Sequence, residues 1–266
     1  MAEIKSERIT LEDLPQRRQA LAWLREEKGK SREALKEADL IEGRFHEEVV
    51  DIIWEHYLIG KHMIMEAREK NGLVELPARV MKSAEGYLLM RSSALKAQEY
   101  IDRYDVAAKR PRSGRFLGEV EMLIGNHKKA AEYFGKSVSL FSKMDDPSDR
   151  VNALELSGFW AEALILGGKA KDGVEIATQT FKAYDQGDGL ELKNRDYYTW
   201  AVWKSGCAIK AWHALFQKGI SPEGKDRETL VEMLKGSGEI VNVPPTWGDF
   251  SLRRDEITSI MKSLRL

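Results

Sequence analysis

Apolar side chains recur at steps of three and four residues along most of this chain, and that spacing is typical of amphipathic α-helices. The clearest run covers residues 45–69, where an apolar side chain returns to the same helical face at every turn. Only residues 240–243 resemble a strand, and Pro244 limits that run because proline cannot donate a hydrogen bond to a β-ladder. We therefore expect an all-α protein of ten or eleven antiparallel helices with short connections, which is an α-solenoid or a large bundle.

Capping and turn residues predict where these helices begin and end. Asp146 followed by Pro147 is a strong helix start, because aspartate caps a first turn and proline is tolerated there. Gly86 leaves open whether the helix around it is continuous or split. The expected helices span about residues 10–28, 31–43, 45–69, 77–107, 115–124, 127–143, 146–166, 172–184, 192–218, 222–236 and 251–264. The expected irregular segments are 109–115, 187–189 and 236–249.

The composition of the 266 residues narrows the classes of function. Lys and Arg number 42 against 43 for Asp and Glu, so no net field steers the protein toward nucleic acid or an anionic membrane. Cys207 is the only cysteine, which rules out an internal disulfide and fits a reducing compartment. The N-terminus lacks the apolar core of a secretory signal, and the longest apolar runs fall short of the roughly 18 to 20 residues that cross a bilayer. We expect a soluble, cytoplasmic protein that binds neither membrane nor nucleic acid.

Small residues recur at matching intervals in two consecutive helix pairs. In each pair a small residue is followed by another after 12 residues and by a third after 7 more. The two sets are Gly118, Ala130 and Ser137, and then Ala161, Gly173 and Thr180. Antiparallel helices need small side chains where their axes approach closely, so the pattern predicts a repeated helical hairpin. Gly206, 45 residues after Ala161, is the candidate for a third repeat.

The first of these hairpins resembles the tetratricopeptide repeat family. The matching positions are Leu117-Gly118, the turn glycine Gly125, and Ala130 with Phe134 of the A-x-x-x-F pattern. Gly114 and Glu121 stand where the family usually has a large aromatic residue and a tyrosine. The interval from Gly118 to Ala161 is 43 residues, against roughly 34 in the standard repeat, so these repeats are expected to be elongated.

The resemblance implies a right-handed superhelix whose concave groove is lined by the first helix of each pair. It places residues 1–266 in a single solenoid, with the best repeats at 112–143 and 146–185, a weaker repeat at 192–236 and a terminal capping helix at 251–264. Proteins similar to this family are usually adaptors that bind an extended peptide, a partner helix or one another. The expected function is therefore a non-catalytic scaffold that binds a protein or peptide partner, with homo-oligomer formation as a further option.

The repeat register also implies which side chains face the groove. They are Arg115, Glu119, Met122, Glu162, Ile165, Trp200 and Trp203. Two of them are glutamates, whereas the family's carboxylate-binding arrangement uses Lys, Asn and Arg, so we expect a basic or apolar ligand rather than an acidic C-terminus. Trp200 and Trp203 have a second interpretation as core residues between helices. An alternative function also involves these two residues. The protein would then be a regulatory module that senses a small ligand in a pocket near Trp200, Trp203 and the loop at 244–247.

The remaining histidines, cations and cysteine do not show the spacing of a metal site, a nucleic-acid site or a catalytic site in the sequence. His46, His56 and His62 lie on one expected helix at steps of ten and six residues, which do not converge on one metal ion. The basic segment at 109–115 lacks the interleaved aromatics of a nucleic-acid site, so a solvated loop is expected there. Cys207 is expected to be a small buried residue. We expect no catalytic residue, no metal and no cofactor.

Overall fold

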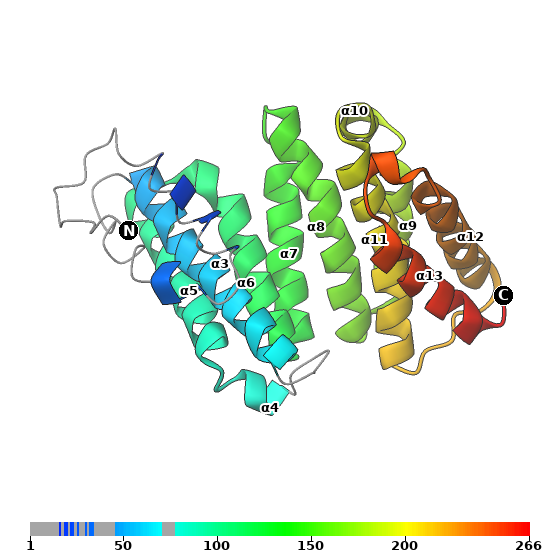
Figure 1. The fold of residues 1–266 in the computed structure, drawn as a ribbon, viewed down its shortest axis with the longest axis horizontal. Coiled ribbons are helices and arrows are strands. Elements are labelled where there is room, and N and C mark those ends of the chain that lie inside the picture. The colour runs from blue at the N-terminus through cyan, green and yellow to red at the C-terminus, as the bar shows by residue number, and fades with distance from the viewer. Residues whose placement is uncertain are drawn as a thin grey trace. The chain divides into compact units, whose positions relative to one another are not determined.

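The computed structural model describes residues 46–70 and 78–266, together with scattered positions between 16 and 34. This part of the chain is all-α, with eleven α-helices, α3 to α13, and no strand among the described residues (Figure 1). The all-α fold class is therefore confirmed. The helices expected at 10–28 and 31–43 fall largely outside the described residues. The chain divides into two compact units, 1–125 and 126–266, called here the N-terminal and C-terminal units and described separately.

The N-terminal unit contains four α-helices in its described residues. They are α3 (His46–Lys70), α4 (Ala78–Met81), α5 (Glu85–Tyr104) and α6 (Arg110–Leu123), with a short 3₁₀ turn, η1 (Ala107–Lys109), before α6. Helix α3 packs along α5, and α5 packs against α6. The buried apolar side chains of α3, among them Ile52, Ile53 and Tyr57, follow the three- and four-residue steps of the sequence pattern.

Gly86 lies in the first turn of α5, where the backbone of α5 closely approaches that of α3 at Gly60. A Cβ atom on Gly60 of α3 would lie 2.5 Å from the carbonyl oxygen of Gly86, and a Cβ on Gly86 would meet the carbonyl oxygen of Gly60. Both positions therefore require glycine, because any side chain would force the two backbones apart. The expected helix at 77–107 is split before Gly86, where Ala84 adopts an extended backbone conformation between α4 and α5.

The expectation of a loop at 109–115 is wrong, because α6 already begins at Arg110. Pro111 lies in the first turn of α6, where its fixed φ suits a helix and its missing N–H leaves no hydrogen bond unmade. The cations of this segment therefore project from a helix rather than from a solvated loop.

The C-terminal unit contains seven α-helices. They are α7 (His127–Phe141), α8 (Pro147–Leu166), α9 (Ala170–Ala183), α10 (Gly187–Arg195), α11 (Tyr197–Gln217), α12 (Gly224–Val241) and α13 (Ser251–Leu264), with a 3₁₀ turn, η2 (Pro245–Trp247), before α13. Helix α8 begins as predicted, since the Asp146 side chain accepts a hydrogen bond from the N–H of Ser148 at 2.8 Å. The terminal helix begins at Ser251 as predicted.

Helices α8 and α9 form one antiparallel pair, and α11 and α12 form the next (Figure 1). Helix α11 packs on both α8 and α9, and α12 also contacts α9, so the two pairs stack on each other. Small residues lie at the contacts: a Cβ on Gly173 of α9 would lie 2.6 Å from the carbonyl oxygen of Ala161 on α8. A Cβ on Gly158 would lie 3.4 Å from the sulfur of Cys207 on α11. Stacked pairs with small residues at their crossings are the packing of helical repeats.

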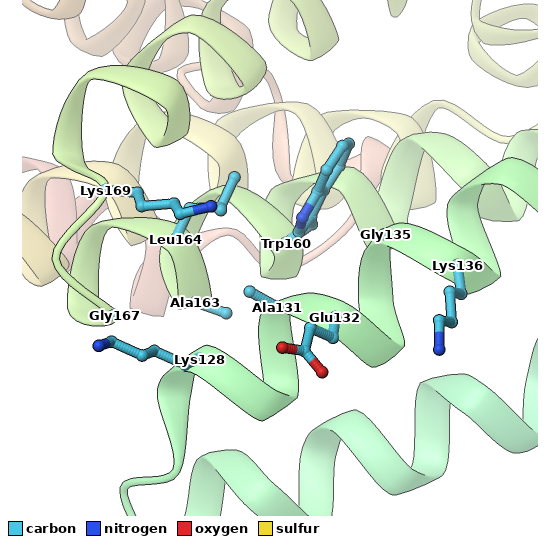
Figure 2. A pocket seen from close by; sticks show the side chains of 10 residues that line it. All are labelled: Lys128, Ala131, Glu132, Gly135, Lys136, Trp160, Ala163, Leu164, Gly167 and Lys169. Carbon is cyan, nitrogen blue, oxygen red and sulfur yellow. The ribbon is translucent and has the colours of Figure 1, made fainter.

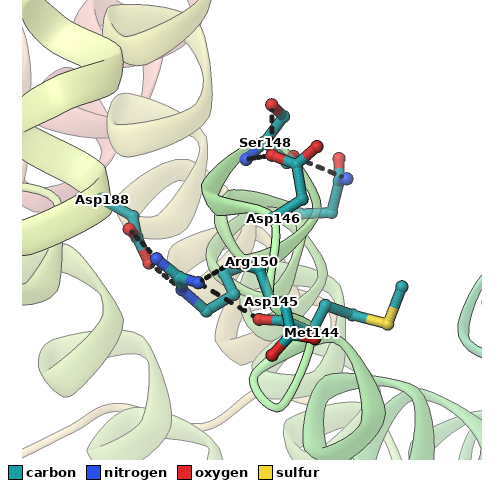
Figure 3. A network of polar contacts seen from close by, with 7 residues as sticks. Met144, Asp145, Asp146, Ser148, Arg150 and Asp188 are labelled. Carbon is teal, nitrogen blue, oxygen red and sulfur yellow. Dashed lines mark hydrogen bonds and ion pairs between the residues drawn. The ribbon is translucent and has the colours of Figure 1, made fainter.

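Helix α10 was not expected, because residues 187–189 were predicted to be a loop. Arg150 of α8 explains how this helix is held (Figure 3): its Nε and Nη2 donate to the two carboxylate oxygens of Asp188, each at 2.9 Å. The same guanidinium donates to the backbone carbonyls of Met144 and Asp145. One side chain therefore joins the α7–α8 turn to the first turn of α10.

Two further boundaries differ from the expected ones. The helix expected at 192–218 is interrupted at Asp196, whose side chain accepts a hydrogen bond from the N–H of Thr199 at 3.0 Å and caps α11. Helix α12 continues to Val241, so residues 237–241 are helical rather than irregular or strand-like. The buried side chain of Val241 explains why this last turn stays in the helix.

Candidate binding pocket on α7 and α8

The predicted groove residues Arg115 and Glu119 contact each other instead of standing free. The Glu119 carboxylate accepts hydrogen bonds from Arg115 Nε (3.0 Å), Lys61 Nζ (3.2 Å) and the Tyr57 hydroxyl (2.9 Å). Burial raises the pKa of Glu119, but the charges of Lys61 and Arg115 outweigh that effect and hold it below the ordinary range. Glu119 is therefore an ionised carboxylate that is already neutralised, and it offers little to a basic ligand.

The basic segment at 109–115 is neutralised in a similar way. Its ion pairs to aspartates are Lys109–Asp51 and Arg110–Asp105, each at 2.8 Å. Lys109 and Arg112 also lie over the ring of Trp54, at 5.6 Å and 5.5 Å from its centroid, which is cation–π distance. Lys109 and Arg112 therefore contact α3, and Arg110 pairs with Asp105 just after α5, so these cations do not form an open patch for phosphate groups.

The other predicted groove residues differ in exposure. Ile165 is fully buried and Trp200 is 2 % exposed, whereas Met122, Glu162 and Trp203 are partly exposed. The Trp200 indole N–H donates to the backbone carbonyl of Tyr184 at 2.8 Å. The structure thus places Ile165 and Trp200 in the core of the C-terminal unit, where neither side chain can contact a partner.

The surroundings of Trp200 are filled by the protein's own side chains. Lys204 lies 4.6 Å from the ring centroid of Phe181 and 5.0 Å from that of Trp200. Its ammonium group donates to both carboxylate oxygens of Asp185, at 2.5 and 2.6 Å. Lys193 lies over Trp200 as well, at 4.6 Å. The position that a cationic ligand would take beside this tryptophan is therefore occupied by lysine.

A pocket of about 360 Å³ lies on the surface of α7 and α8 (Figure 2). Helix α7 contributes residues at steps of three and four, so that one helical face lines the pocket, and α8 contributes the facing turns. The lining residues are Lys128, Ala131, Glu132, Gly135, Lys136, Trp160, Ala163, Leu164, Gly167 and Lys169. This volume is near the lower end of the range for ligand sites and suits one large side chain.

The indole of Trp160 lies against the backbone of α7 at Gly135. A Cβ atom on Gly135 would lie 3.1 Å from Cε2 and 3.2 Å from both Nε1 and Cζ2 of that indole. The absence of a side chain at 135 therefore lets the flat ring settle on the helix, while Trp160 remains partly exposed. The result is an aromatic wall that solvent, or a ligand, can reach.

The pocket has an apolar floor and a charged rim. Ala131, Ala163 and Leu164 form the floor, and all three are at most 8 % exposed. The rim carries the exposed side chains of Lys128, Glu132, Lys136 and Lys169, which Figure 2 shows projecting around the opening. Within the described residues, none of these four side chains forms an ion pair. Such a site can bind an apolar group that carries charge at its edges.

Sequence reasoning missed this pocket, although two signals pointed to it. Gly135 interrupts a strongly amphipathic helix without a turn or a cap to explain it. Lys128, Glu132 and Lys136 recur at steps of four on the same helix, so they share one exposed face. Only the structure shows that this face meets Trp160 of the following helix.

The histidines form no metal site in the described part of the chain. His56 donates through Nδ1 to the carbonyl of Ile52 at 3.0 Å, and the side chain of His46 lies outside the described residues. Among the side chains that the structure describes, no three of His, Cys, Asp and Glu gather as metal ligands would.

No described helix combines the length and the apolar character needed to cross a membrane.

The chain matches no protein-family model and no curated protein sequence. Its functional interpretation therefore rests on the residues and geometry described above.

Proposed function

We propose that the protein is a non-catalytic helical-repeat scaffold that binds a segment of a partner protein in the pocket on α7 and α8. The observation that carries this proposal is the partly exposed indole of Trp160, held against Gly135 above an apolar floor. Tryptophan is strongly enriched among the residues that dominate binding energy at protein interfaces. A helix-lined recess with one aromatic wall is a suitable receptor for an anchoring side chain of a peptide.

The stacking of α8–α9 on α11–α12 supports the scaffold part of the proposal. Stacked helix pairs bury their core by contact with neighbouring pairs and leave extended faces for partners. We propose that these pairs are elongated tetratricopeptide-like repeats, separated by the inserted helix α10. The single thiol, Cys207, is buried, which is compatible with the cytoplasmic location proposed for this function.

Replacement of Trp160 by alanine tests the proposal most simply. Trp160→Ala removes the aromatic wall, and we expect it to abolish capture of the specific partner while the thermal unfolding midpoint changes little. Trp247→Ala is the matched control, because Trp247 is 51 % exposed and lies outside the pocket. Partner capture that is equal for the wild type and Trp160→Ala, or lost equally in both variants, would contradict the proposal.

A further inference from the structure

The charges at the rim of the pocket indicate what kind of segment it accepts. We propose that the occupant is an acidic, extended segment that inserts one large apolar side chain against Trp160 and places carboxylates beside the lysines on both sides. This inference rests on the proposed function and specifies its partner. It differs from the sequence-based expectation of a basic or apolar ligand, which relied on glutamates at another surface.

The lysines of the rim are not engaged within the described part of the protein. Lys128, Lys136 and Lys169 contribute three positive charges against the single negative charge of Glu132. By contrast, Lys204, which lies beside the rings of Phe181 and Trp200 in the same unit, is paired with Asp185. Among the described residues, no lysine or arginine lies over the ring of Trp160. The pocket therefore presents an uncovered aromatic face next to uncompensated positive charge.

The spacing of the rim charges fits a peptide in extended conformation. Lys128 and Lys136 are eight residues apart on α7, which corresponds to about 12 Å along the helix axis. An extended chain covers that distance in about three or four residues. An acidic residue on each side of the apolar anchor would thus meet one lysine at either end of the pocket.

Glu132 lies between Lys128 and Lys136 on α7, and its negative charge disfavours an acidic residue at the centre of the pocket. A carboxylate placed there would face a negative charge, whereas backbone N–H groups of an extended segment could donate hydrogen bonds to it. The arrangement therefore favours an apolar residue at the centre and acidic residues at the ends. A basic segment would meet two lysines at the ends and gain only one attractive contact at the centre.

Binding of synthetic peptides to the full chain tests this inference. We would use three fluorescein-labelled peptides of equal length with a central leucine, flanked on both sides by glutamates, serines or lysines, and measure fluorescence anisotropy. The acidic peptide should bind about tenfold more tightly than the serine peptide, and added salt should reduce that preference because it screens exposed charges. The lysine peptide should bind most weakly.

Charge variants separate the pocket from general electrostatic attraction. Lys136→Glu should weaken binding of the acidic peptide about tenfold, and Glu132→Gln should strengthen it. Lys225→Glu is the matched control, because it makes the same charge change at an exposed position of α12 outside the pocket; it should change binding by less than about twofold. Circular dichroism of each variant verifies that the helices remain intact.

The outcomes distinguish failure of this inference from failure of the proposed function. Preference for the serine or lysine peptide, with binding still abolished by Trp160→Ala, would overturn the acidic-segment inference and leave the pocket as a peptide site. Acidic-peptide binding that Trp160→Ala does not reduce would also overturn it, since the charges would then act away from the pocket. Absence of binding by all three peptides up to about 1 mM would overturn both.

Discussion

The indole ring of Trp160 on α8 packs against α7 at Gly135, where the absence of a side chain leaves room for the ring. A methyl group on residue 135 would lie 3.1 Å from the indole, closer than ordinary van der Waals contact. The ring is partly exposed, so it can be displaced toward solvent. This pair therefore defines the shape of the proposed binding pocket without being essential to the core.

Gly135→Ala should change binding more than stability. Alanine is favoured over glycine inside a helix by about 1 kcal/mol, and this gain should offset the cost of shifting the indole. We expect a nearly unchanged unfolding midpoint but several-fold weaker peptide binding, measured by thermal denaturation and anisotropy. Unchanged binding in this variant would show that the position of the indole does not matter.

Gly86→Ala in the N-terminal unit, unlike Gly135→Ala, should lower the stability of the protein. The new Cβ would meet the backbone carbonyl of Gly60, and backbone cannot move aside as an exposed indole can. We expect a loss of about 1–3 kcal/mol in the free energy of unfolding, the usual cost of overpacking. Gly238→Ala in α12 is the control, since its nearest neighbour would lie 3.9 Å away; it should leave stability unchanged or slightly higher. Chemical denaturation compares the two.

Lowering the pH should reduce the stability of the N-terminal unit, because it protonates the Glu119 carboxylate. Its folded-state pKa lies below the ordinary value of 4.5, so its stabilising contribution is fully present above about that pH and is lost as the pH falls through the lower, folded-state value. Glu119→Gln removes this titration. Below pH 4.5, the difference in unfolding free energy between wild type and variant should shrink as the pH falls; a constant difference would contradict the assignment.

Arg150 should matter more for stability than a typical surface arginine. It donates to both oxygens of Asp188 and to two backbone carbonyls (Figure 3). Arg150→Ala should therefore lower the unfolding midpoint and speed amide hydrogen exchange in α10. Arg103→Ala is the control, because its ion pair with Glu99 is exposed on both sides and contributes little. Equal effects of the two substitutions would show that α10 is held by other contacts.

The thiol of Cys207 should be unreactive in the folded protein. Burial raises its pKa to about 12, against a smaller opposing effect of Lys210 and Lys204, so almost no thiolate is present near neutral pH. A disulfide reagent such as dithiobis-nitrobenzoate at pH 8 should react only after denaturant is added. Rapid reaction of the native protein would place Cys207 at the surface instead.

The sequence was informative where local chemistry decides the structure. The start of α8 at Asp146 and Pro147 was predictable because a cap and a first-turn proline act within a few residues. Helical periodicity likewise predicted the all-α class. The start of α6 at Arg110 was missed because the positive charges of residues 109–115 suggested solvent, whereas Asp51 and Trp54 of α3 provide partners for them.

The site could be predicted less well, because its properties depend on residues far apart in the sequence. Glu119 suggested a basic ligand, but Lys61, which helps to neutralise it, lies 58 residues away. Trp200 suggested a groove, yet it is buried, and its indole N–H donates to the backbone carbonyl of Tyr184, 16 residues earlier in the chain. The contact of Trp160 with Gly135 likewise arises from the packing of α8 on α7, which periodicity does not reveal.

Indole N–H resonances offer the most direct test of the central claim, that the pocket at Trp160 is the binding site. The chain has seven tryptophans, and a Trp160→Phe variant assigns the relevant signal in a ¹⁵N correlation spectrum. On titration with the acidic peptide, the Trp160 signal should shift, while those of Trp200 and Trp212, whose N–H groups are bound to buried carbonyls, should stay in place. A shift of the Trp247 signal with no change at Trp160 would contradict the account.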